Sequence, residues 1–130
     1  MIAHRHDTAL DHDGIAATID SFATALASGS LEQTMYHFDQ HAILIPHDHA
    51  LPQEGSGAVR SYYRRRLGSV RDARIEIETV EAGHNNDQAR VRIVLHLGAR
   101  SLPGLVALQR RNHRWLISHF MVTPAQPQAA

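Results

Sequence analysis

The first third of the chain carries apolar residues at helical spacing. Four apolar residues at intervals of four, three and four lie on one face of a predicted helix: Ile15, Ile19, Phe22 and Leu26. We expect Asp13 to cap the start of this helix and Gly29 to end it in the left-handed conformation that glycine adopts without strain.

A second helix is predicted to begin directly after this glycine. Ser30, with Gln33 three residues later, has the pattern of a capping box. The apolar face of this helix comprises Leu31, Met35 and Phe38. Two helices joined through a single Gly-Ser step must meet at a sharp angle.

A short buried strand over residues 42–45 is predicted next, ending at Pro46. Residues 47–57 contain two prolines and two glycines and are therefore expected to form a loop. A third helix is predicted over residues 58–67, ending at Gly68, with an apolar side of four residues: Val59, Tyr62, Tyr63 and Leu67. Tyr62 and Tyr63 are expected to point to different sides of this helix, so that at most one enters a pocket.

The rest of the chain alternates with the period of strands. Strands are predicted over residues 73–79, 89–97, 105–111 and 114–123, with a turn at residues 84–87, a turn or bend at 101–104 and a tight hairpin at Asn112-His113. The last strand is apolar on both faces. Trp115, Ile117 and Met121 alternate onto one face with His119, and the other face carries Ser118 and three apolar residues: Leu116, Phe120 and Val122.

Three helices followed by an antiparallel meander define an α+β fold with the helices on one face of the sheet. We predict a flexible segment over residues 1–12, a single domain over 13–123 and a disordered tail over 124–130. Since no helix remains to cover the second apolar face of the last strand, we expect a second copy of the chain to cover it. The protein is therefore predicted to be a homodimer through the outer face of the sheet, a reading supported by apolar Val106 and Leu108 opposite Leu105 and Ala107.

Composition excludes several classes of function. The 130 residues contain no cysteine, which excludes disulfides and thiolate chemistry. Basic and acidic residues balance at 13 each, so there is no overall charge favouring nucleic acid, and we interpret Arg64–Arg66 as a solvated helix end rather than a phosphate site. The longest apolar run, residues 43–45, is too short to cross a membrane, and no secretory signal is visible, so we expect a cytoplasmic protein.

Four segments resemble the nuclear transport factor 2-like superfamily in its order and spacing. They are residues 22–31, 38–44, 57–63 and 115–119, and the resemblance covers about residues 13–123. It implies a cone in which a strongly bent sheet wraps around the helices and leaves an apolar pocket at its wide end. It also implies dimerisation through the outer face of the sheet.

The resemblance includes ketosteroid isomerase-like, scytalone dehydratase-like and polyketide cyclase-like proteins, so it does not identify one activity. The general base of the ketosteroid isomerase-like members is an Asp at the end of the first strand, and the matching position here is Pro46. Their oxyanion-donating Tyr falls on or near Phe22, which has no hydroxyl. The usual isomerase machinery is therefore missing.

Histidines supply the candidate chemistry. His47, next to Asp48, is a candidate general base at the pocket mouth, with surface loop residues as the alternative reading. His47 and His49, with His41 or Asp39, also have the residue types of a metal site. The loop after them offers no obvious third ligand and little support for ligating imidazoles, so we predict no bound metal and no cofactor.

His119 and the tyrosines complete the candidate site. A buried His119 is predicted to act as a neutral base or donor, or else as a structural residue or part of the dimer interface. An inward-facing Tyr62 hydroxyl is a candidate oxyanion donor, and Tyr36 is a weaker one because it lies off its helix's apolar stripe. The candidate ligand-binding residues, which serve equally well as core, are Phe22, Met35, Phe38, Leu44, Tyr63, Trp115 and Met121.

Two classes of function remain open. The first is a cofactor-free isomerase, dehydratase or cyclase that acts by acid–base chemistry on a small, apolar, oxygen-bearing substrate. The second is a ligand-binding or oligomerisation module without turnover.

Overall fold

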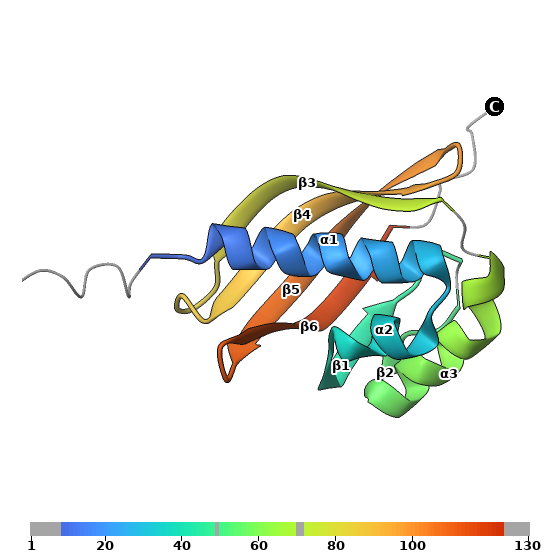
Figure 1. Ribbon diagram of the computed structural model, residues 1–130, viewed down its shortest axis with the longest axis horizontal. Coiled ribbons are helices and arrows are strands. Elements are labelled where there is room, and N and C mark those ends of the chain that lie inside the picture. Colours follow the sequence, from blue (N-terminus) through green and yellow to red (C-terminus); the bar gives the residue numbers. More distant parts are fainter. Residues whose placement is uncertain (1–8, 49, 70–71, 124–130) are drawn as a thin grey trace, which may run out of the picture.

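The computed structural model describes residues 9–48, 50–69 and 72–123, and shows three helices lying on one face of a six-stranded bent sheet (Figure 1). Residues 1–8 of the predicted flexible segment and the predicted tail over 124–130 lie outside the described residues. In chain order the elements are α1 (His12–Ser28), α2 (Leu31–Tyr36), β1 (Phe38–Ile45), β2 (Gln53–Glu54), α3 (Ser56–Arg66), the 3-10 turn η2 (Leu67–Ser69), β3 (Ala73–Ala82), β4 (Gln88–Leu97), β5 (Arg100–Arg111) and β6 (Arg114–Val122). The α+β class is therefore confirmed. In the described part of the chain, no helix is both long enough and apolar enough to cross a membrane.

The sheet has the strand order β2-β1-β6-β5-β4-β3, so the last strand of the chain lies in its interior. β1 and β6 are parallel, and all other neighbours are antiparallel. In Figure 1, α1 crosses one face of the sheet, while α2 and α3 lie together at one end beside β1 and β2.

Helix α1 is capped by Asp11 and not by the predicted Asp13. The Asp11 carboxylate accepts a hydrogen bond from the Gly14 N–H at 3.0 Å, whereas Asp13 lies in the first turn, where a negative charge stabilises the helix dipole. The predicted end is confirmed, since Gly29 has a φ of 74° and donates its N–H to the carbonyls of the last turn.

Helix α2 begins as predicted, with the Ser30 hydroxyl accepting from the Gln33 N–H, but it is only six residues long. Phe38, predicted on its apolar face, instead begins β1, four residues before the predicted start of that strand. The reason is non-local. Phe38 pairs with Ile117 of β6, and the Ile117 N–H donates to the His37 carbonyl at 2.7 Å, so the neighbouring strand extends β1 toward its N-terminus.

Strand β5 contains the segment predicted to be a turn or bend. It runs unbroken from Arg100, and the turn lies earlier, at Gly98 and Ala99. Pro103 fits inside the strand because its backbone faces β6 at the point where β6 ends. There its carbonyl accepts from the Thr123 N–H, and no N–H is required of it on the β4 side.

The apolar residues on both alternating positions of β6 were predicted to mean that a second copy of the chain covers the outer face. In the structure, a break in the alternation explains most of them. The pairing with β5 shifts register between Ala107 and Leu108, so that Ala107 lies opposite His119 while Leu108 lies opposite Ile117. Ser118 is thus the extra residue of a β-bulge, and the alternation restarts after it. The core-facing side chains of β6 are consequently Trp115 and Ile117 before the bulge, and Phe120 and Val122 after it.

This bulge corrects the prediction that His119 shares a face with Trp115 and Ile117. His119 and Met121 lie on the outer face of the sheet and are partly exposed. The pair Val106 and Leu108 on β5 faces the core, and only the smaller pair Leu105 and Ala107 faces outward.

The core lies between α1 and the inner face of the sheet, with Phe22 near its centre. The Phe22 ring makes edge-to-face contacts with Phe38 of β1 and Phe120 of β6, each with ring centroids 5.3 Å apart. It also contacts the ring of His37, whose two nitrogens are bonded to the Gln33 carbonyl and the Ser21 hydroxyl. One aromatic side chain therefore joins α1 to the parallel strand pair.

We expect Gly104→Ala to destabilise the protein and Gly57→Ala not to. A Cβ at Gly104 would lie 2.7 Å from the Met121 carbonyl oxygen, which is backbone and cannot move aside without disturbing β6, whereas nothing lies within 4 Å of a Cβ at Gly57 in α3. Urea unfolding should show a loss of about 1–3 kcal/mol for Gly104→Ala and a change within about 0.5 kcal/mol for Gly57→Ala. Equal stability of the two variants would contradict the register assigned to β5 and β6.

Candidate functional site

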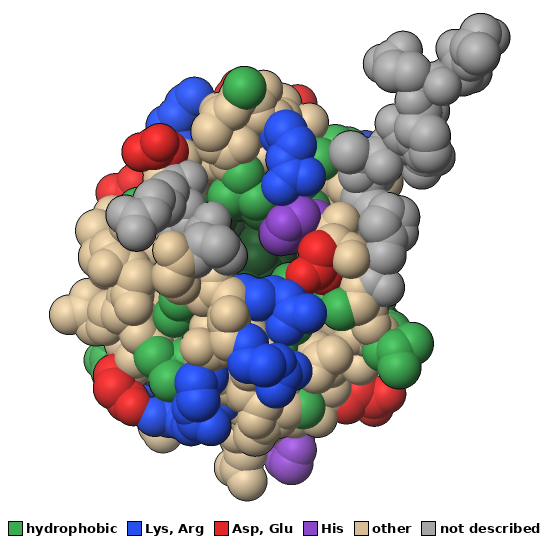
Figure 2. Space-filling view, turned by 90° about the vertical axis from the view of Figure 1, so that its right-hand side faces the viewer, with side chains coloured by type: hydrophobic (Ala, Val, Ile, Leu, Met, Phe, Trp, Pro, Cys, Tyr) green, Lys and Arg blue, Asp and Glu red, His purple; other side chains and the backbone are tan. Residues whose placement is uncertain are grey.

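An apolar cavity lies at the end of the molecule where α3 meets the C-terminal ends of β1, β4 and β6. Its lining is mostly aliphatic and aromatic and comprises Leu26, Leu44, Pro46, His47, Tyr62, Tyr63, Leu95, Leu97, Phe120 and Val122. Figure 2, which faces this end, shows a recess with apolar side chains in its depth and a histidine, basic and acidic side chains around it. The cavity volume is about 30 Å³, which is room for a water molecule or two and not for a drug-sized ligand.

His47 is the histidine of the cavity lining. It follows Pro46 directly after β1 and is half-buried. Burial lowers its pKa below the ordinary value, the nearby Asp48 carboxylate acts to raise it, and the cations Arg100 and Arg66 act to lower it. The imidazole is therefore held neutral at the cavity, the form that accepts a proton.

Asp48 is the centre of the polar network at the cavity mouth. Its Oδ2 accepts hydrogen bonds from the Tyr62 hydroxyl at 3.0 Å and from the Arg66 Nε at 2.7 Å, and its Oδ1 accepts from the Ala50 N–H at 3.2 Å. Burial acts to raise the pKa of Asp48, but the hydrogen bonds from Ala50, Arg66 and Tyr62 outweigh it and hold the pKa below its usual range. The Asp48 carboxylate therefore bonds Tyr62 and Arg66, and the hydrogen bonds that the structure shows for it do not include one to His47.

Both tyrosines of α3 line the cavity, which corrects the prediction that at most one could. They are buried, with ring centroids 5.3 Å apart in an edge-to-face arrangement. Consecutive residues of a helix are separated by only about 100°, and the core wraps around α3 widely enough to bury both. Burial raises the pKa of each phenol, so Tyr62 remains protonated and donates to Asp48.

Arg66 was not among the predicted site residues, although the sequence contained a signal for it. It follows Tyr62 by four residues and therefore lies on the same face of α3, and its guanidinium is 4.2 Å from the centre of the Tyr62 ring. The aliphatic lining from β4 and β6 was likewise not predicted, because alternation marks such residues as core without distinguishing core from cavity.

The structure separates several predicted site residues from this cavity. His119 lies on the outer face, where its Nδ1 is 3.4 Å from the Ser118 hydroxyl, so it does not meet His47. Of the seven predicted ligand-binding residues, Leu44 and Tyr63 line the cavity. Phe22, Phe38 and Trp115 are buried core, Met35 is partly buried against that core, and Met121 is on the outer face. Tyr36 is exposed, and the Arg114 guanidinium lies 3.6 Å from the centre of its ring.

The His47-Asp48-His49 segment is only partly visible, because His49 lies outside the described residues. Among the residues that are described, no cluster of three or more His, Cys, Asp or Glu side chains could hold a metal ion. The absence of metal and cofactor remains a prediction.

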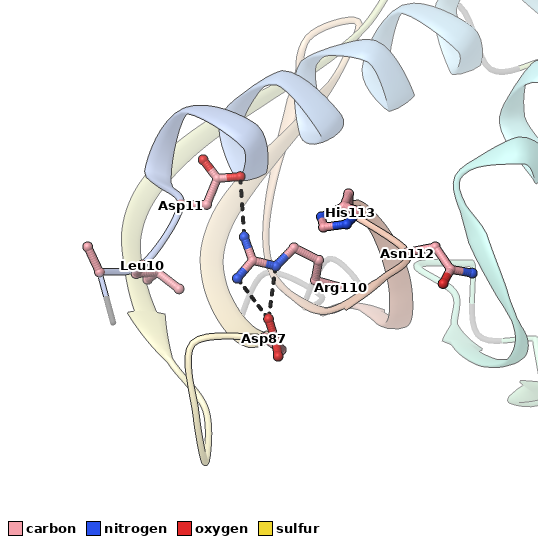
Figure 3. A pocket seen from close by; sticks show the side chains of 7 residues that line it. Leu10, Asp11, Asp87, Arg110, Asn112 and His113 are labelled. Carbon is pink, nitrogen blue, oxygen red and sulfur yellow. Dashed lines mark hydrogen bonds and ion pairs between the residues drawn. The ribbon is translucent and has the colours of Figure 1, made fainter. Parts of the chain in front are cut away.

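A larger but open and polar groove lies at the opposite end of α1 (Figure 3). There the guanidinium of Arg110 bonds Asp87 through Nε at 2.9 Å and Nη2 at 2.7 Å, and Asp11 lies 3.9 Å from Nη1. Asp11 also accepts from the Trp115 indole N–H at 3.1 Å. These contacts tie the start of α1 to the strand ends, and both carboxylates are used in doing so, so we assign this groove a structural role.

Comparison with solved structures shows which known proteins share this fold. It is similar to a protein from Xanthomonas campestris described as a calcium/calmodulin dependent protein kinase II association domain (20% identity, 93% of this chain and 94% of that one, TM-score 0.73). A structure of the same description from Thiobacillus denitrificans matches at 22% identity (85% and 94%, TM-score 0.67). A ketosteroid isomerase-like protein from Erwinia carotovora atroseptica matches at 16% identity (88% and 96%, TM-score 0.73). A comparison with curated proteins found no match.

These similarities show a cystatin-like α+β fold, the class to which the resemblance in the sequence pointed. The SnoaL-like domain model matches residues 15–123, and the chain belongs to this family. Membership relates it to isomerases and cyclases without assigning an activity.

We expect the His47 imidazole to titrate below its ordinary pKa of 6.5 in an NMR titration of the ring protons. Asp48→Asn should lower the midpoint further because a negative neighbour is lost, and Arg100→Gln should raise it because a positive neighbour is lost. Since the folded pKa lies below the unfolded one, His47 costs stability as the pH falls from about 6.5 through its folded pKa. Shifts of the two variants in the same direction would contradict this assignment.

Proposed function

We propose that this protein binds a small, apolar, oxygen-bearing molecule in the cavity at the end of α3, and that His47 exchanges a proton with it. The observation that carries the proposal is a half-buried imidazole, disfavoured in its charged form by burial, at the wall of an otherwise apolar cavity. A neutral imidazole in such a place accepts a proton from an acidic C–H or O–H group and returns it to another atom. This is the chemistry of isomerases, dehydratases and cyclases.

The residues around His47 define the conditions for such chemistry. The Pro46 ring and the Leu44 and Phe120 side chains keep the floor apolar, so a bound molecule is shielded from water. The Tyr62 hydroxyl already donates its hydrogen bond to Asp48. It can donate to a ligand oxygen only when its hydrogen bond to Asp48 is broken. Catalysis in this cavity therefore relies on His47 first.

The size of the cavity sets a further condition on the ligand. Because the free volume is only about 30 Å³, a bound molecule must displace lining side chains. Leu97 and His47 are partly exposed at the mouth, unlike the deeper residues Leu44 and Val122, so they are the side chains that move with least loss of packing. We therefore expect a compact ligand whose binding opens the mouth.

An NMR titration with 2-naphthol tests the binding proposal. We expect saturable shifts at His47, Leu97 and neighbouring amides with a Kd of about 0.1–1 mM. Leu97→Trp should fill the mouth and raise the Kd at least about tenfold, whereas Leu51→Trp, at a position 80% exposed and outside the cavity lining, should leave it unchanged. His47→Gln should weaken binding about three- to tenfold by altering the polar partner.

Shifts that persist in Leu97→Trp, or that map to the outer face of the sheet, would contradict the cavity as the binding site. A folded wild-type protein without saturable shifts would contradict the proposal itself.

A second candidate function is assembly without turnover, through a homodimer on the outer face of the sheet. It is supported by partly exposed apolar side chains on three neighbouring strands: Ile43, Ile45, Leu105, Leu116 and Met121. Two of the similar structures are described as kinase association domains. With the β-bulge, four of the six apolar residues of β6 that first suggested a dimer face the core: Trp115, Ile117, Phe120 and Val122. The dimer proposal therefore rests on the outer row of residues.

Sedimentation velocity at micromolar concentration tests the dimer. We expect twice the 14.5 kDa mass of one chain. Met121→Lys should give a monomer, because Met121 pairs with Leu105 in the apolar row, whereas Thr79→Lys on the exposed part of β3 should not. A monomeric wild-type protein would overturn this second proposal and leave the cavity proposal standing.

A further inference from the structure

Three polar side chains form a hydrogen-bonded row on the outer face of the sheet, on the far side of the wall that β4 forms for the cavity. They come from three adjacent strands: Glu76 from β3, His96 from β4 and Ser101 from β5 (Figure 1 shows these strands). The His96 Nδ1 is 2.9 Å from the Ser101 Oγ, and its Nε2 is 3.0 Å from the Glu76 Oε1. A hydroxyl, an imidazole and a carboxylate are thus linked in order.

Strand register holds this row in place. Ser101 lies directly opposite His96 on the β4–β5 hairpin, whose turn is Gly98-Ala99 with Gly98 at a φ of 59°. Glu76 is opposite Val94, one diagonal step from His96, a separation that a glutamate side chain spans. Because all three residues sit on paired strands, their backbone positions are fixed relative to one another.

The hydrogen bonds define the roles of the three groups. A carboxylate only accepts, so the Nε2–H of His96 donates to Glu76, and in the neutral ring the lone pair of Nδ1 accepts from the Ser101 hydroxyl. This is the relation of nucleophile, base and orienting acid that activates serine, with the two ring nitrogens exchanged relative to the usual arrangement. Either nitrogen serves as the base once the other is hydrogen-bonded.

The chain contains an internal comparison in Ser118 and His119 on β6. There the serine Oγ lies 3.4 Å from the imidazole Nδ1, and the hydroxyl donates instead to the Ala107 carbonyl at 3.1 Å. The structure shows no carboxylate bonded to the His119 ring among the described residues. Adjacent serine and histidine alone therefore do not produce the arrangement found at Ser101.

The backbone N–H of Ser101 lies on the side of β5 that faces away from β4. The Pro103 carbonyl points toward β6, where it accepts from Thr123, and in a strand every second residue points its backbone to the same side. The Ser101 N–H accordingly points away from β4. Ser101 lies outside the paired part of β5 and β6, whose last pair is Gly104 and Val122. In the described part of the sheet no strand pairs with it there.

We propose that Ser101 is a reactive serine that hydrolyses small acyl esters, with His96 as its base and Glu76 as the residue that positions His96. Ser101 and Glu76 are exposed, so the structure favours short acyl groups with good leaving alcohols over large substrates. This activity is independent of the cavity on the inner face.

The reaction needs only ester and water. The Ser101 Oγ attacks the carbonyl carbon as its proton passes to His96 Nδ1. The C–O bond to the alcohol then breaks, and the leaving oxygen takes up that proton. Water attacks the acyl-serine, returning a proton through His96 to Ser101, and the carboxylic acid is released.

Covalent labelling by a fluorophosphonate is the test, because attack by the serine displaces fluoride and leaves a mass increment that peptide mapping places on one residue. We expect the wild-type protein to be labelled at Ser101 and to hydrolyse p-nitrophenyl acetate with a burst. Ser101→Ala should abolish the labelling, and Ser118→Ala, the matched control, should leave it unchanged. His96→Ala should slow labelling at least about 100-fold and Glu76→Gln about tenfold or more.

Thermal melting of each variant separates positioning from folding. A Glu76→Gln protein that melts like the wild type yet labels slowly supports the positioning role. Labelling that is absent from folded wild-type protein, that maps to another serine, or that proceeds equally fast in His96→Ala would overturn the proposal. Each result is obtained without reference to cavity ligands, so neither outcome depends on the function proposed for His47.

Discussion

The β-bulge at Ser118 is the constraint on which the arrangement of the molecule depends. It lets β6 keep its core-facing side chains against α1 on both sides of the irregularity, with Ile117 before it and Phe120 after it. Without the extra residue, every side chain beyond Ile117 would turn to the opposite face, and Phe120 would leave its contact with Phe22. The bulge also turns His119 outward, which leaves the inner cavity with His47 as its ionisable base.

Asp48 is the residue that organises the cavity mouth. One carboxylate oxygen holds both the Tyr62 hydroxyl and the Arg66 guanidinium, which joins the segment after β1 to α3. A partly desolvated carboxylate with several donors remains charged, and its charge partly offsets the effect of burial on His47. The stability of the mouth and the protonation of its base are therefore linked through one residue.

The SnoaL-like fold supplies the scaffold for these groups without determining their chemistry. The resemblance in the sequence matches Pro46 to the position of the base in ketosteroid isomerase-like proteins, and in this structure Pro46 forms apolar cavity wall with His47 next in the chain. Phe22 stands at or near the position of their oxyanion donor and packs at the centre of an aromatic cluster. The acid–base chemistry proposed here therefore assigns the proton transfer to a histidine, next to the position at which the resemblance places the aspartate of ketosteroid isomerase-like proteins.

The sequence by itself determined the features that depend on neighbours along the chain. The left-handed end of α1 at Gly29, the Ser30 cap of α2 and the Asn112-His113 hairpin, with φ values of 53° and 65°, were all predictable because a few adjacent residues supply their energetics. The order of helices and strands followed from hydrophobic period in the same way. His47 was selected as a candidate at the pocket mouth through the resemblance to the superfamily, which places the rim of the pocket at residues 47–49.

Only the tertiary structure decided which residues meet across strands. The early start of β1 at Phe38 depends on pairing with β6, and Pro103 is tolerated inside β5 because β6 ends beside it. The row of Glu76, His96 and Ser101 spans three strands and residues 76–101 of the sequence, with no motif to mark it. Register and bulges are properties of pairs of strands, and a one-residue shift reverses the face of every side chain that follows, so alternation within a single strand cannot specify them.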